Sequence, residues 1–91
     1  MAVDDFHRIE SLLLALAERI PLKGKTAAMF REYIDHGEYG LALDETGIGM
    51  FDAGRSPSAE ELDRFRVLAA LMKLDVEECL DEARERARYP E

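Results

Sequence analysis

The apolar residues of this chain recur every three or four positions along almost its whole length. In the first segment the recurring positions are Phe6, Ile9, Leu12, Leu13, Leu16 and Ile20. This spacing places side chains on one face of an α-helix, whereas a half-buried strand requires strict alternation of apolar and polar residues. No stretch alternates for long enough to predict a strand. The pattern therefore predicts an all-α fold.

Glycine and proline residues divide this pattern into five segments. Pro21 and Gly24 follow the first segment. Gly37 follows the second, at the position just after a helix where a left-handed backbone conformation favours glycine. The third segment is the weakest helix, because Gly47 and Gly49 each disfavour a helix by about 1 kcal/mol relative to alanine. The predicted helices span approximately residues 3–20, 26–36, 38–53, 58–72 and 75–88.

Two of the predicted helices begin with residues that pair with the free backbone N–H groups of a first turn. Ser58 and Glu61 have the spacing of a capping box, in which each side chain accepts a hydrogen bond from the backbone N–H of the other residue. Asp75 and Glu78 repeat this spacing at the start of the last helix. These pairs fix the starts of the fourth and fifth helices.

Short connections between successive helices favour antiparallel packing of neighbours. We therefore predict a single domain, residues 1–91, folded as a small antiparallel bundle of about five helices. The predicted core residues are Leu13, Phe30, Tyr39, Leu43, Phe65, Leu68 and Leu80. Cys79 falls on the apolar face of the fifth helix, where a free cysteine is expected to pack as a small hydrophobic residue.

The residues that could support catalysis form no recognisable arrangement. The chain has two histidines, one cysteine and three serines, and none stands in a nucleophile, base and orienting-group pattern. His7 and Glu10 share a helical face, but a zinc site requires further ligands. We therefore predict no enzyme activity, no catalytic residue, no metal and no cofactor. Turnover that depends on His7, His36 or Cys79 would contradict this prediction.

The charge of the chain limits its partners. Twenty acidic and twelve basic side chains give a net charge of -8, which would repel a phosphate backbone, so no direct nucleic-acid partner is expected. No apolar run approaches the roughly 18–20 residues of a membrane span. Asp4 and Asp5 also stand where a signal peptide would be basic. These features predict a cytoplasmic protein, whose charge serves either solubility or attraction of a basic partner.

The acidic residues are unevenly distributed along the chain. The stretch from Glu32 to Gly54 contains six carboxylates and no lysine or arginine. Five of these are the predicted partner-binding residues: Asp35, Glu38, Asp44, Glu45 and Asp52. A second acidic run, residues 75–82, is explained by the preference of carboxylates for the first turns of a helix. We therefore expect the first stretch to contact a basic surface, and the second to contribute less.

The segment from Tyr33 to Leu43, with Gly-Glu-Tyr-Gly-Leu-Ala-Leu at residues 37–43, resembles the signature of the MafI-like immunity proteins of bacterial polymorphic toxin systems. These are small helical proteins of about this length. The resemblance implies a protein made beside a toxin, which binds the toxic domain and occludes its active site. Many such toxins are nucleases with basic clefts, for which an acidic binder is suited. The glycine-rich residues 46–49 depart from the family pattern.

The sequence also allows a function of a different class. An acidic helical adaptor or regulator that docks on a non-toxin protein would show the same composition. A toxin gene directly upstream would favour the immunity function, whereas a sigma-factor or secretion gene would favour the adaptor.

Overall fold

The computed structural model describes residues 3–88, and these form an all-α fold without a strand. The helices are α1 (Val3–Arg19), α2 (Gly24–Asp35), α3 (Tyr39–Phe51), α4 (Ala59–Leu71) and α5 (Val76–Arg88). A short 3₁₀ turn, η1 (Asp52–Gly54), follows α3. The predicted fold class and the five predicted helices are confirmed.

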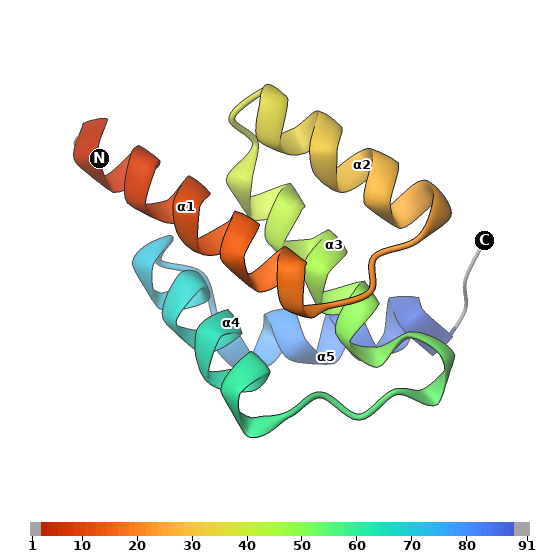
Figure 1. Ribbon diagram of the computed structural model, residues 1–91. Helices are drawn as coiled ribbons and strands as arrows, with labels where there is room; N and C mark the ends of the chain where they lie inside the picture. The colour runs from red at the N-terminus through yellow and green to blue at the C-terminus, as the bar shows by residue number, and fades with distance from the viewer. Residues whose placement is uncertain (1–2, 89–91) are drawn as a thin grey trace.

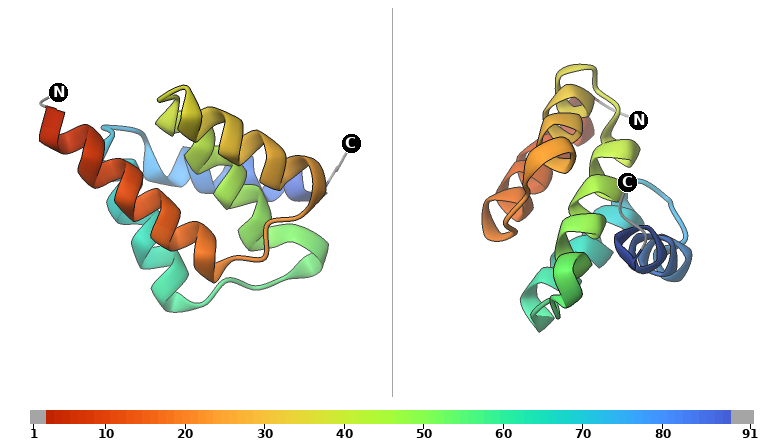
Figure 2. Two further views of the ribbon diagram at one scale, coloured as in Figure 1. Left: turned by 45° about the horizontal axis from the view of Figure 1, so that its top comes forward. Right: turned by 90° about the vertical axis from the view of Figure 1, so that its right-hand side faces the viewer.

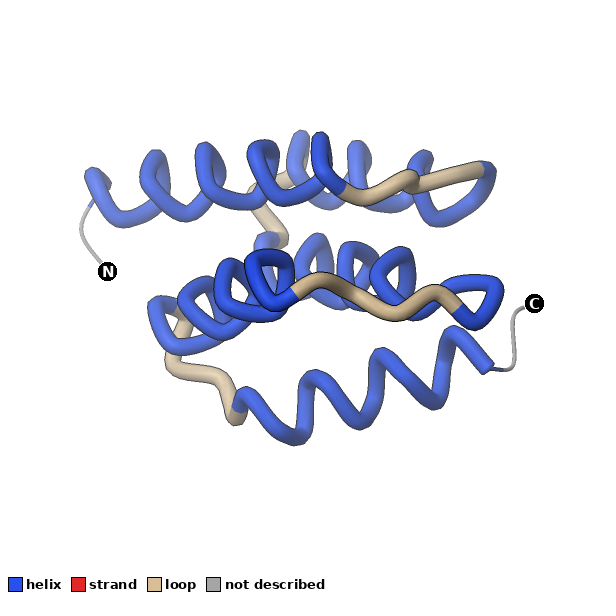
Figure 3. The backbone as a smooth tube through the Cα atoms, turned by 60° about the horizontal axis from the view of Figure 1, so that its bottom comes forward, coloured by secondary structure: helices blue, strands red, loops and turns tan. Residues whose placement is uncertain are grey.

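The helices are arranged in three layers, and α3 lies at the centre. Helices α1, α2 and α3 reverse direction in turn (Figure 1). Figure 3 shows α1 and α2 in one outer layer, α3 and α4 in the middle, and α5 in the other outer layer. Figure 2 shows α1 and α2 on one side of α3 and α5 on the other. As a result, α3 packs against each of the other four helices.

The helix that the sequence marked as weakest is therefore the most deeply buried one. Its two central glycines, Gly47 and Gly49, are both buried. A Cβ atom at Gly47 would lie 2.7 Å from the Cβ of Ala83 on α5, and one at Gly49 would collide with Leu22. These glycines lower the intrinsic helix propensity of α3, but they let its backbone approach the neighbouring elements closely. Packing outweighs propensity here.

Six of the seven predicted core residues are buried. Leu13, Phe30, Leu43, Phe65, Leu68 and Leu80 are all at most 7% exposed. Tyr39 is the exception, because its ring lies at the edge of the core beside the ring of Phe6. Its hydroxyl donates a hydrogen bond to Glu10 Oε1 at 3.1 Å. Cys79 is also only partly buried, although it packs against the core.

The turn between α2 and α3 has the geometry predicted from Gly37. This glycine has a φ of 68°. Its N–H donates to the carbonyl of Ile34 at 3.1 Å, and the N–H of Glu38 donates to the carbonyl of Tyr33 at 2.8 Å. This pair of bonds defines a Schellman motif, which ends the helix and fixes the direction of α3.

The end of α4 has the same motif with a lysine in place of glycine. Lys73 has a φ of 58°, and the N–H groups of Lys73 and Leu74 donate to the carbonyls of Ala70 and Ala69. A left-handed conformation is unfavourable for a residue with a Cβ. We expect Lys73→Gly to raise the free energy of unfolding by about 0.5–1 kcal/mol, measured by urea denaturation. The matched change Gly37→Ala should lower it by about 1 kcal/mol, and a stabilised Gly37→Ala protein would contradict this account.

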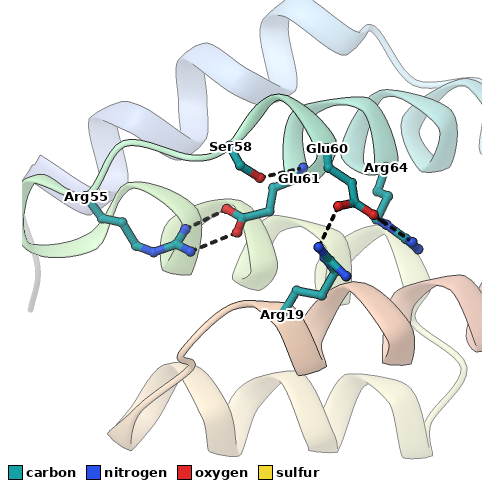
Figure 4. A network of polar contacts seen from close by, with 6 residues as sticks. All are labelled: Arg19, Arg55, Ser58, Glu60, Glu61 and Arg64. Atoms are coloured by element: carbon teal, nitrogen blue, oxygen red, sulfur yellow. Dashed lines mark hydrogen bonds and ion pairs between the residues drawn. The ribbon is translucent and has the colours of Figure 1, made fainter.

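The predicted capping box at the start of α4 forms only in part. Ser58 Oγ accepts a hydrogen bond from the N–H of Glu61 at 3.1 Å. The carboxylate of Glu61 does not return the bond, because both of its oxygens pair with Arg55, at 2.7 and 2.8 Å (Figure 4). Arg55 holds the pKa of Glu61 below its ordinary value. At the start of α5, Asp75 Oδ1 accepts from the N–H of Glu78, so this predicted box also forms only in its first half.

Candidate protein-binding surface

The structure separates the five predicted partner-binding residues into two groups. Asp35 and Glu38 lie at the turn between α2 and α3, where both are exposed. Asp44 and Glu45 lie in the middle of α3, and Asp52 lies in η1 just after it. Because α3 packs against α5 at this end, the second group meets charged residues of α5, whereas the first group does not.

Asp44 belongs to an acidic face formed by α3 and α5. Burial raises the pKa of the Cys79 thiol, and the negative charges of four carboxylates raise it further: Asp44, Glu82, Glu78 and Asp75. We call these four residues the acidic face. The raised thiol pKa disfavours the nucleophilic thiolate, so Cys79 is poorly suited to covalent chemistry.

Asp44 is the least favourable charge on this face. Its side chain is partly buried, and its carboxylate forms no hydrogen bond or ion pair within 4 Å with any residue between 3 and 88. Burial raises its pKa, and the negative charge of Glu82 raises it further, while Arg86 opposes the shift. Such uncompensated charge destabilises a fold and is more common at binding and catalytic sites than elsewhere.

Glu45 lies next to Asp44 in sequence, but its side chain lines a groove. It is only 7% exposed and lines a groove of about 580 Å³ between α2, α3 and the end of α5. We call this cavity the α2–α3–α5 groove. Asp52 and Glu85 line it as well. Glu45 therefore does not belong to the acidic face, although it adjoins Asp44 in sequence.

The other two predicted partner-binding residues, Asp35 and Glu38, belong neither to the acidic face nor to the lining of the α2–α3–α5 groove. Asp35 lines a second groove, of about 540 Å³, between α1 and α2, whose walls include Leu14, Phe30 and Ile34. Glu38 precedes the first residue of α3, and its side chain accepts no capping hydrogen bond. Nothing brings Asp35 or Glu38 together with Asp44.

The sequence analysis attributed Glu78 and Glu82 to the helix dipole and did not consider Glu85, but these three acidic residues of α5 lie beside the predicted ones. Glu78 and Glu82 join Asp44, and Glu85 joins Glu45 and Asp52 in the groove. Their spacing of three and four residues already places them on one side of the last helix. The helix dipole explains why carboxylates are tolerated near the start of α5. It does not exclude a second role for the same side chains.

Two kinds of feature are absent from the described residues: a cluster of metal ligands and a helix that could span a membrane. Among residues 3–88, no three histidine, cysteine or carboxylate side chains are grouped as metal ligands. None of the five helices is both long and apolar enough to span a bilayer. His36 pairs its ring Nδ1 with the carbonyl of Glu32 at 2.8 Å, so that it closes the end of α2.

No protein-family model, curated protein or solved structure matches this chain. The residues that carry the resemblance to immunity proteins have structural roles in this fold. Gly37 ends α2, Leu43 is buried in the core, and Tyr39 packs at its edge. The fold and the electrostatics of its surface are therefore the basis for assigning a function.

Proposed function

We propose that this chain is an immunity protein that binds a basic, nuclease-type toxin domain and neutralises it by covering the active site. The acidic face is the proposed contact surface. The observation that supports this most directly is Asp44, a partly buried carboxylate that has like-charged neighbours and no ion-pair partner among residues 3–88. A basic partner would supply the missing counter-charge, and opposite charges would also speed the encounter.

The resemblance of residues 37–43 to the immunity family supports the choice of a toxin as that partner. A protein that must bind a nuclease cleft presents carboxylates where the nucleic-acid phosphates would lie, and the net charge of -8 agrees with this. The proposal is one of binding and not of turnover. Capture of partners from the native cell, followed by mass spectrometry, tests it directly. Recovery of a transcription or secretion component in place of a toxin would favour the adaptor function.

Asp44→Asn should make the protein more stable but weaken its binding to the partner. In the wild-type protein the pKa of Asp44 is raised above its usual value near 3.8 by burial and by Glu82. The folded state therefore binds a proton more readily than the unfolded state, and its stability increases as the pH falls through the raised pKa. Asparagine removes the unfavourable charge. We expect the variant to unfold at a higher temperature at pH 7 and to lose this part of the pH dependence.

The same variant should bind its partner more weakly, by about 2 kcal/mol or more, because a desolvated charge pair is lost. The matched control is Asp63→Asn on α4, where the side chain is 76% exposed. That control should change stability and affinity by less than about 0.5 kcal/mol. Thermal melts from pH 4 to 8 and surface-binding kinetics measure both effects. An Asp44→Asn protein with unchanged affinity would show that the acidic face is not the contact surface.

A further inference from the structure

Glu45 lies at the wall of the α2–α3–α5 groove, and its ion-pair partner among residues 3–88 is the loosely placed guanidinium of Arg86. Its side chain is more than nine-tenths buried, and none of residues 3–88 donates a hydrogen bond to it. The nearest cation is Arg86, whose Nη2 lies 3.7 Å from Oε2, beyond hydrogen-bond distance. Burial raises the pKa of Glu45, and Arg86 and Lys25 only partly offset this. No fully buried side-chain oxygen of the described residues lacks a hydrogen-bond partner, so the unbonded oxygens of Glu45 keep some access to solvent. They therefore have unused acceptor capacity.

The other groove residues indicate which kind of group would use that capacity. Asp52 and Glu85 add two carboxylates to that of Glu45, against the cations Lys25 and Arg86. Among the described residues of the lining the balance is one net negative charge, which favours a cation over an anion.

Apolar side chains form part of the groove walls. Met29, Tyr33 and Ile48 line it beside the charged residues. Apolar walls that lead to a carboxylate suit a long side chain with an aliphatic stem and a cationic end. Arginine fits better than lysine, because its planar guanidinium donates two parallel hydrogen bonds to one carboxylate.

We propose that the α2–α3–α5 groove receives an arginine side chain of the protein partner, whose guanidinium pairs with Glu45 at the wall and with Asp52 at the rim. This inference rests on the proposed function in one respect, that the partner is a basic protein. The arginine would anchor the complex beside the acidic face, since both surfaces are formed by α3 and α5. A single arginine buried in a pocket commonly supplies much of an interface's affinity.

The inference can be tested on the full chain without the partner, by heteronuclear NMR titration with acetyl-arginine methylamide. The neutral isostere acetyl-citrulline methylamide is the control, and acetyl-lysine methylamide with a free side-chain amine tests the choice of cation. We expect saturable shifts at the amides of Met29, Glu45 and Ile48 with the arginine probe, weaker shifts with lysine, and none with citrulline. Glu45→Gln should weaken arginine binding at least about fivefold. Asp63→Asn, on α4, should leave it unchanged.

Equal shifts with arginine and citrulline, shifts that do not saturate, or unchanged binding by a folded Glu45→Gln protein would each overturn the inference. Because the citrulline comparison uses the wild-type chain, the test does not depend on whether the variant folds. The outcome is also separable from that of the proposed function. A groove that binds arginine in a protein that captures no toxin would leave the site standing and reject the immunity function. Capture of a toxin by a protein whose groove binds no arginine probe would support the immunity function and reject the arginine site.

Discussion

Truncation of Phe65 to alanine is expected to lower the free energy of unfolding by about 3–5 kcal/mol, because the ring is fully buried and its loss would leave a cavity between α3 and α4. A domain of this size is commonly stable by only about 5–10 kcal/mol, so the variant should lose a large part of its stability. Urea denaturation followed by far-ultraviolet circular dichroism measures the change.

The control for this experiment lies two residues away on the same helix. Val67 is 49% exposed, so Val67→Ala removes apolar atoms from α4 without opening a cavity. We expect it to change stability by less than about 0.5 kcal/mol. Similar losses from Phe65→Ala and Val67→Ala would mean that the buried face of α4 has been assigned incorrectly.

Replacement of Gly47 by alanine should destabilise the protein by about 2–3 kcal/mol, although the same change normally stabilises a helix. The new Cβ would lie 2.7 Å from the Cβ of Ala83 and 3.1 Å from Cε2 of Phe65. The Cβ of Ala83 is attached directly to the backbone of α5 and cannot rotate away. Relief of the overlap therefore requires α3 and α5 to separate, which weakens the packing of both.

Gly40→Ala provides the matched control within the same helix. No atom lies within 4 Å of a Cβ built at Gly40, so the substitution has only its effect on helix propensity. We expect it to raise the free energy of unfolding by up to about 1 kcal/mol. The two alanine variants should therefore shift the thermal midpoint in opposite directions. A stabilising Gly47→Ala substitution would show that α3 and α5 are packed less closely than described.

The position of α3 has consequences for the candidate binding surface. Gly47, which allows α5 to approach, also brings the acids of α5 beside Asp44. The close approach that stabilises the core thus produces the unfavourable charge on the surface. If Gly47→Ala moves α5 outward, the pKa of Asp44 should fall toward its ordinary value, because both the burial and the effect of Glu82 are reduced.

The features that were predictable from sequence are those encoded by residues close together in the chain. The period of three to four residues defined the five helices, and Gly37, Ser58 and Asp75 placed three of their ends. The same period identified most of the core, since a helix buries the face on which its apolar residues recur. Tyr39 was assigned to the core because its spacing fits, but its hydroxyl requires a partner, and Glu10 holds it at the edge.

The candidate site depended instead on contacts between distant segments. Adjacent side chains of a helix point about 100° apart, so Asp44 and Glu45 face different directions. The sequence could not reveal that Asp44 faces the acids of α5 while Glu45 faces a groove, because this depends on where the other helices pack. Nor could it reveal that Glu61 pairs with Arg55 in preference to closing its own capping box. Local sequence thus determined which residues form helices and where the helices end. Only tertiary packing decided that the glycine-rich α3 lies at the centre and which charges are left without a counter-charge, because both depend on how closely helices approach one another in space.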